Sequence, residues 1–152
     1  MTIAGTLVQE VDIKCHGNLL HDTFKHKLHE CVIMSPDKVK HCDLVTGQWG
    51  APGSVISSDY MYDGKVITAK EVIEAVDDEN HKIVFKVIEG EVLKDYNAFT
   101  STHHVEDRGG KRLVTWTVDF EKLNPSVPDP SPYMEWLSSF TKDMDAYILK
   151  LA

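Results

Sequence analysis

The sequence has few cysteines and lacks the cysteine spacings of metal or redox sites. Its 152 residues include three cysteines, Cys15, Cys31 and Cys42, and no C-x-x-C pair. An odd number at wide spacing excludes a disulfide scaffold and is typical of reduced thiols in an intracellular protein. The N-terminus has no basic region followed by an apolar core, as a signal peptide would have, and no apolar run approaches the ~20 residues of a membrane span. We therefore expect a soluble, cytoplasmic protein with no membrane span.

Basic residues are also in the minority. Lys and Arg number 16 against 24 Asp and Glu, the formal net charge is −8, and no five-residue basic run occurs. Such a charge repels phosphate backbones and anionic lipids, which argues against a nucleic-acid partner. The length predicts a single domain, residues 1–152, with a sizeable core.

Three glycines at every third position, Gly47, Gly50 and Gly53, form the most conspicuous local pattern. A Walker loop would end in Lys followed by Ser or Thr, but here Gly53 is followed by Ser54 and Val55 without a lysine. A dinucleotide fingerprint would open a helix, whereas β-type residues follow here. The pattern predicts a structural turn between two strands.

Hydrophobic periodicity predicts an α+β protein. Alternation favours strands at residues 3–13, 55–62, 66–76, 83–88, 96–106 and 114–120, with the Asp63-Gly64 pair typical of a hairpin. Helical spacing predicts one short helix from residue 18 to about 28, and Ser35-Pro36 predicts a second at 35–40. After a proline-rich connector at 124–132, a long amphipathic helix occupies residues 133–151. An antiparallel sheet of six or seven strands around one helix is expected to leave an internal cavity.

Several motifs together resemble the major latex proteins of plants, a branch of the Bet v 1 / pathogenesis-related class 10 family. They are the turn Gly47-x-x-Gly50-x-Pro52-Gly53-Ser54-Val55, the hairpin Asp63-Gly64-Lys65, AKEVIEAVD at 69–77, FKVIEG at 85–90 and VTWTVDFEK at 114–122. The resemblance runs nearly end to end. It implies the helix-grip fold, in which a seven-stranded antiparallel curved sheet, two short helices and a long C-terminal helix enclose an apolar cavity. It also implies plant origin and a small apolar ligand.

Strand alternation and the family pattern together indicate which side chains face this cavity. The candidate ligand-binding residues are Phe24, Ile56, Ser58, Tyr60, Phe85, Phe99, Ser101, His103, Trp116, Tyr133, Leu137, Phe140 and Met144. The alternative is that each belongs to an ordinary core. Ser58 stands where relatives usually have Trp, so it is expected to widen the cavity. Ser101 and His103 stand where relatives continue with apolar residues.

His103 is the preferred polar contact for a ligand, because a neutral imidazole can donate or accept a hydrogen bond and can act as a general acid or base. A shift of one residue in strand register would turn His104 inward instead. Glu71 also faces inward in one register.

Other clusters are weaker. His26, His29 and Cys31 have the residue types of a metal site but no further ligand at a fixed spacing, so no metal is expected. The neighbouring pairs of Cys15 with His16 and of His41 with Cys42 lack the surrounding signature of a thiol nucleophile.

Three functions remain open. The first is binding of a small hydrophobic plant metabolite, such as a terpenoid, phenolic or hormone-like molecule. The second is a cyclase or isomerase of plant specialised metabolism, acting on iridoid, terpenoid or alkaloid intermediates without a cofactor, with Ser101, His103 and Tyr133 as candidate catalytic residues. The third is a regulatory module that captures a protein partner through the Trp49 loop.

Overall fold

The computed structural model describes residues 3–151. In chain order the elements are β1 (Ile3–Asp12), α1 (Gly17–His26), the 3-10 turn η1 (Leu28–Glu30), α2 (Cys31–Met34), β2 (Val39–Thr46), β3 (Val55–Tyr62), β4 (Lys65–Asp77), β5 (Lys82–Gly90), the 3-10 turn η2 (Glu91–Lys94), β6 (Tyr96–Arg108), β7 (Lys111–Lys122) and α3 (Ser131–Leu151). Within this range no helix is long and apolar enough to cross a bilayer.

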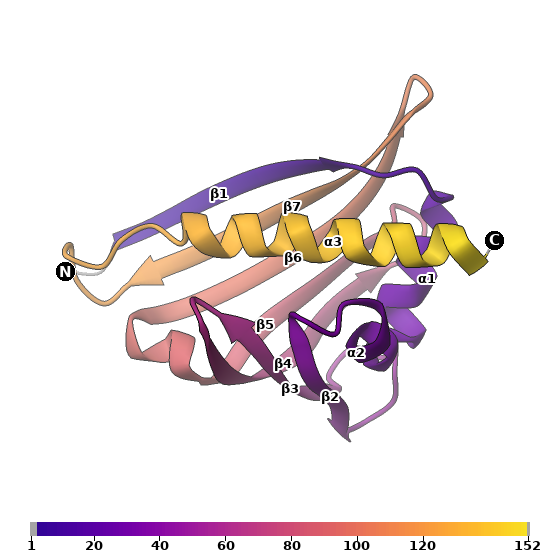
Figure 1. Ribbon diagram of the computed structural model, residues 1–152. Coiled ribbons are helices and arrows are strands. Elements are labelled where there is room, and N and C mark those ends of the chain that lie inside the picture. The colour runs from indigo at the N-terminus through magenta and orange to yellow at the C-terminus, as the bar shows by residue number, and fades with distance from the viewer. Residues whose placement is uncertain (1–2, 152) are drawn as a thin grey trace.

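The strands form one antiparallel sheet in the order β1-β7-β6-β5-β4-β3-β2. Figure 1 shows α3 running along one face of this curved sheet, with α1 and α2 near its C-terminal half. The buried apolar residues of the strands and of α3 form one core cluster between these layers. The predicted helix-grip fold, with seven strands and a long C-terminal helix, is confirmed.

The prediction of a second helix at 35–40 is wrong. The helix ends earlier, as α2, because Ser35 leaves the helical region, with φ of −140° and ψ of 63°, as the residue before a proline tends to do. The Ser35 carbonyl then accepts from the amides of Lys38 and Val39, both at 3.0 Å, which makes a turn into β2. The Ser-Pro pair therefore follows a helix instead of starting one, and the strand β2 lies where part of that helix was expected.

The glycine segment connects β2 to β3 as a structural turn. The backbone is left-handed at each glycine, with φ of 89° at Gly47, 83° at Gly50 and 90° at Gly53. The Ser54 hydroxyl donates to the Gln48 carbonyl at 2.8 Å and accepts from the Gln48 amide at 2.9 Å. The Gly53 amide donates to the Ile73 carbonyl of β4 at 2.7 Å. Amides that a phosphate cradle would direct outward are bonded within the chain here.

Polar contacts, buried or partly buried, hold α3 against the sheet and the turn after α2. The Asp145 carboxylate accepts from the backbone amides of Lys14 at 3.0 Å and Cys15 at 2.8 Å, just after β1. Further ties are the indole of Trp116 to the Thr141 hydroxyl at 2.8 Å, the indole of Trp136 to the Met61 carbonyl at 2.8 Å, and the Ser35 hydroxyl to Asp143 at 2.6 Å. These bonds fix the helix over the concave face.

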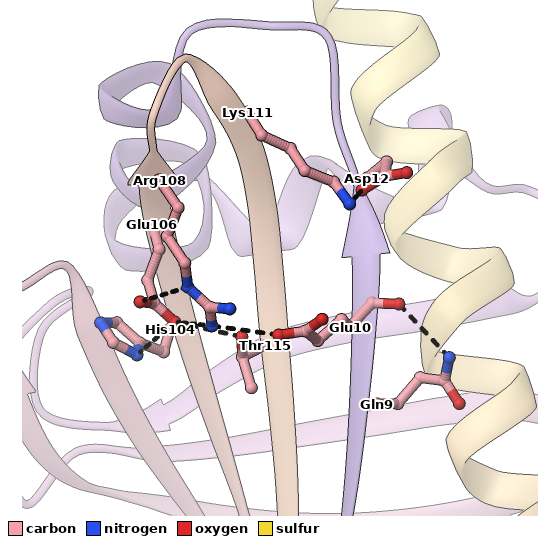
Figure 2. A network of polar contacts seen from close by, with 8 residues as sticks. All are labelled: Gln9, Glu10, Asp12, His104, Glu106, Arg108, Lys111 and Thr115. Atoms are coloured by element: carbon pink, nitrogen blue, oxygen red, sulfur yellow. Dashed lines mark hydrogen bonds and ion pairs between the residues drawn. The ribbon is translucent and has the colours of Figure 1, made fainter.

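The opposite face of the sheet carries an exposed charge network across β1, β7 and β6 (Figure 2). Arg108 contacts Glu106 at 3.1 Å and Glu10 at 3.0 Å, and the His104 ring lies 3.4 Å from the Glu106 carboxylate. His104 therefore faces outward, and its neighbour His103 faces inward. The register is the one in which Ser101 and His103 share a face with Phe99.

Candidate functional site

An inner cavity of about 80 Å³ lies between the concave face of the sheet and the helices. Its lining is Phe24, Leu28, Cys31, Val39, Cys42, Ile56, Ser58, Tyr60, Glu71, Phe85, Ser101, Trp116, Tyr133, Trp136, Leu137 and Phe140. Most of these side chains are apolar or aromatic. Such a surface suits a small hydrophobic molecule fixed by a few polar groups.

A second space, the outer hollow, adjoins the inner cavity and has a volume of about 450 Å³. It is lined by Tyr60, Tyr62, Asp63, Lys65, Ile67, Glu91, Val92, Lys94, Asp95, Tyr96, Phe99, Pro128, Asp129, Pro130, Pro132 and Tyr133. Tyr60 and Tyr133 line both spaces. The Tyr133 ring lies 5.1 Å from the Phe99 ring and 6.0 Å from the Trp136 ring, so aromatic side chains form the partition.

Most of the predicted ligand-binding residues come together around the inner cavity. Those in its lining are Phe24, Ile56, Ser58, Tyr60, Phe85, Ser101, Trp116, Tyr133, Leu137 and Phe140. Phe99 lines the outer hollow instead. His103 and Met144 are completely buried and line neither space.

His103 lies behind the cavity wall. Its ring stacks on Phe24 with centroids 3.9 Å apart and meets Trp116 edge to face at 4.9 Å. Among the described residues, neither ring nitrogen has a hydrogen-bond partner. Burial lowers the pKa of His103 to about 3, so the ring is neutral near pH 7. The rings of Phe24 and Trp116, which both line the cavity, lie against this imidazole.

Six lining residues were not among the predicted set: Leu28, Cys31, Val39, Cys42, Glu71 and Trp136. Val39 and Cys42 lie on β2, and the sequence patterns do not predict a strand there. Trp136 precedes Phe140 by one helical turn, so the same periodicity that found Phe140 could have found it. Glu71 alternates in phase with the buried Ile73, which is the signal that it faces inward.

Glu71, a half-buried residue of β4, is the carboxylate of the inner cavity. It pairs in register with Ile56 of β3 and Val87 of β5, both buried. Burial raises the pKa of Glu71 to about 7. On α3, burial and then the nearby Glu71 charge raise the pKa of Tyr133, while the Ser101 hydroxyl acts in the opposite direction. A carboxyl group, a phenol and a hydroxyl therefore share one apolar space.

The cysteines are free thiols in the structure, and the surroundings of Cys15 and Cys42 oppose ionisation. Hydrogen bonding with Cys31, followed by burial, raises the pKa of Cys42. Burial, followed by a hydrogen bond with Asp145, raises the pKa of Cys15 to about 12. A nucleophilic thiolate needs the opposite shift. Residues 3–151 contain no group of three or more side chains placed to hold a metal ion.

The Trp49 side chain is half buried. Its indole lies 5.2 Å from the His29 ring, between centroids, and packs against the edge of the core cluster. The tryptophan of the glycine loop therefore packs against other residues of the same chain.

Comparison with known proteins agrees with this geometry. The sequence profile of the pathogenesis-related protein Bet v 1 family matches residues 2–151. MLP-like protein 31 of Arabidopsis thaliana is 35% identical over 150 residues, covering 97% of this chain and 88% of that protein. MLP-like protein 34 of the same plant is 36% identical over 146 residues, but the chain spans only 46% of its length.

The solved structures place the chain in the same group. Ginseng major latex-like protein 151 from Panax ginseng superposes with a TM-score of 0.92 at 38% identity, covering 95% of this chain and 97% of that one. Norcoclaurine synthase from Thalictrum flavum shares the fold, with a TM-score of 0.81 at 15% identity over 97% of this chain and 88% of that one. The chain therefore belongs to the Bet v 1 family, within its major latex protein branch.

Proposed function

We propose that the protein binds a small hydrophobic plant metabolite in the inner cavity, which the ligand reaches through the outer hollow. The observation that carries this proposal is the mainly apolar space between the sheet and α3, into which only a few polar groups project. Terpenoid, phenolic and hormone-like molecules have the matching surface, because they combine an apolar skeleton with one or two polar substituents.

The size of the spaces limits how such a ligand sits. Pockets for drug-sized molecules measure roughly 300–1,000 Å³, well above the 80 Å³ of the inner cavity. A single ring fits with small adjustments, whereas a larger ligand has to displace Tyr60 and Tyr133 and extend into the outer hollow. The partition between the two spaces is the part of the site that we expect to move.

The Ser58 position gives a direct test. Ser58→Trp places an indole in the inner cavity, while Ser57→Trp adds the same group on the opposite face of β3. With the neutral fluorophore prodan as probe, we expect Ser58→Trp to weaken binding at least about tenfold, equivalent to ~1.4 kcal/mol, and Ser57→Trp to leave it unchanged. Equal affinity of both variants, or no binding by the wild-type protein, would contradict the proposal.

A second function, catalysis without a cofactor, is favoured by the polar groups that share the cavity. Ser101, Tyr133 and Glu71 provide hydroxyl, phenol and carboxyl groups in an apolar space that can hold a folded intermediate close to its reacting geometry. The shared fold extends to norcoclaurine synthase, of which one structure contains dopamine and hydroxybenzaldehyde. The reaction class we infer is cyclisation or isomerisation of a terpenoid or alkaloid intermediate.

Incubation with panels of such intermediates separates the two functions. Mass spectrometry would score both retention of the compound and formation of product. Product formed faster than in buffer, and lost in Tyr133→Phe, is the result expected of an enzyme. Retention without product is expected of a carrier. Capture of a protein partner by the glycine loop has less support, because Trp49 packs on His29.

A further inference from the structure

Glu71 is placed where the alternation of β4 otherwise puts apolar side chains. Ile67, Ala69 and Ile73 share its face of the strand and are each at most 4% exposed. The residues paired with it on β3 and β5 are apolar as well. An ionisable group at such a position is costly to bury unless a charge or hydrogen bond compensates it.

Within residues 3–151 no such compensation is present. Burial is the one influence on the Glu71 carboxyl, and no lysine, arginine or histidine lines the inner cavity. The adjacent Lys70 side chain pairs with Glu89 at 3.2 Å, on the other face of the sheet. The carboxyl group therefore faces the cavity without a charged partner, and near pH 7 both its charged and its neutral form are populated.

Aromatic side chains surround the same position. Tyr60 and Tyr133 are close enough to Glu71 for its charge to raise the pKa of each phenol, after the larger effect of burial. Trp136 stacks on Phe140 at 5.0 Å, and both rings line the cavity. The faces of aromatic rings attract cations. The rings and the Glu71 carboxylate therefore both favour a ligand with a positively charged group.

The lining of the outer hollow also carries more negative than positive side chains. It contains four carboxylates, Asp63, Glu91, Asp95 and Asp129, against two lysines, Lys65 and Lys94, and the Asp129 carboxylate is paired with Lys122 at 2.6 Å, which leaves three carboxylates against the two lysines. With a formal net charge of −8 for the whole chain, the field along this route attracts cations and repels anions.

We propose that the inner cavity is selective for apolar molecules that carry a protonated amine, with the amine nitrogen paired to Glu71 and enclosed by the rings of Tyr60, Tyr133 and Trp136. This inference rests on the proposed function and specifies its ligand class. It excludes apolar carboxylates, such as fatty or phenolic acids, as the preferred ligands.

The test uses three single-ring probes that differ in charge: benzylamine, benzyl alcohol and benzoate. Affinities are measured by NMR titration of the wild-type protein, Glu71→Gln, and the control Glu74→Gln, whose carboxyl is on the exposed face of β4. We expect the wild-type protein and Glu74→Gln to bind benzylamine at least about tenfold more tightly than benzyl alcohol, and benzoate most weakly. In Glu71→Gln the amine and the alcohol should bind equally.

The pH dependence gives a second readout. Benzylamine stays protonated around neutral pH, so its affinity should fall as Glu71 gains a proton below about pH 7, while the affinity for benzyl alcohol stays constant. The other titratable groups facing Glu71 are Cys31 and Cys42 from α2 and β2, and Tyr60 and Tyr133 from β3 and α3, with Glu91 at the outer hollow. The raised pKa values of Cys42, Tyr60 and Tyr133 keep these groups neutral over this range.

The outcomes separate the inference from the function on which it rests. If benzyl alcohol and prodan bind but benzylamine gains no advantage, or keeps its advantage in Glu71→Gln, the amine selectivity is wrong and apolar binding stands. If none of the probes binds, both proposals are wrong. Near-native amide spectra of Glu71→Gln would show that the variant is folded.

Discussion

His103 is a polar side chain without a hydrogen-bond partner among the described residues. It is completely buried and stacks on Phe24. An unpaired buried polar group costs about 1–3 kcal/mol. Such a costly group is expected to have a functional role. Because His103 lies directly behind Phe24, we infer that its imidazole becomes accessible to a ligand when the ligand binds.

His103→Leu should therefore stabilise the protein. Leucine has a similar volume and no polar atoms, so we expect the free energy of unfolding to rise by about 1–2 kcal/mol at neutral pH, measured by urea denaturation. His104→Leu removes a half-buried imidazole from the outer face of β6, where it contacts Glu106 at 3.4 Å, and should change stability by no more than about 1 kcal/mol. A destabilised His103→Leu would mean that the imidazole has a partner in solution.

The same residue predicts a pH effect with a definite sign. The pKa of His103 is about 3 in the folded protein against an ordinary 6.5, so between these values the unfolded chain binds more protons. Stability from this residue is complete above pH 6.5 and is lost as the pH falls toward 3, by at most about 1.4 kcal/mol per pH unit. Wild-type protein should thus lose more stability over this range than His103→Leu does. An identical pH profile would contradict the buried neutral ring.

Glu71 has the opposite influence in part of that range. Its folded pKa of about 7 lies above the ordinary 4.5, so its contribution to stability is present below pH 4.5 and is lost as the pH rises through 7. The wild-type profile is the sum of both groups. The effect of His103 therefore appears in the difference between variant and wild type rather than in either curve alone.

At the scale of elements, α3 depends on a single carboxylate for its attachment to the segment after β1. Asp145 is 7% exposed and accepts hydrogen bonds from the backbone amides of Lys14 and Cys15. Both amides would be left without a partner if the carboxylate were removed. The contact joins positions 130 residues apart, so it ties α3 to the segment after β1 rather than stabilising the helix locally.

Asp145→Ala should lower the free energy of unfolding by about 2–4 kcal/mol, because charge-assisted hydrogen bonds are lost and the buried amide of Cys15 and the part-buried amide of Lys14 are left unpaired. The matched control is Asp12→Asn in the exposed network of Figure 2, whose ion pair with Lys111 at 3.5 Å is open to solvent. An exposed pair contributes about 0–1 kcal/mol. Thermal and urea unfolding would measure both, and equal losses would contradict the role given to Asp145.

The elements differ in how well the sequence predicts them. The alternation that runs through β6 from Phe99 and through β7 from Val114, and the helical period of α3, follow from burial on one face, which leaves a clear pattern. The helix α2 is a four-residue apolar turn, too short for a period to appear. The edge strand β2 pairs with only one neighbour and has two register shifts, so its alternation is broken. Residues on these two elements were missed for that reason.

At the scale of the whole molecule, the site consists of two spaces separated by side chains. Which residues face inward follows from strand phase, and the sequence was sufficient for most of the inner lining. The division into a small inner cavity and a larger outer hollow was not predictable, because it depends on how rings from β3, β6 and α3 meet across the sheet. The rotamers that close the partition are set by tertiary packing rather than by periodicity.

The partition predicts that ring size at Tyr133 controls access. Tyr133→Ala joins the two spaces, whereas Leu137→Ala removes a buried side chain that lines the inner cavity alone. Both variants should lose about 2–5 kcal/mol of stability, as large-to-small core substitutions do. In stopped-flow measurements with prodan, we expect Tyr133→Ala to raise the association rate at least about tenfold, because binding no longer waits for a conformational change. Leu137→Ala should leave that rate close to the wild-type value. Equal rates in both variants would mean that ligands reach the inner cavity by another route, since removal of the shared ring would then have opened nothing.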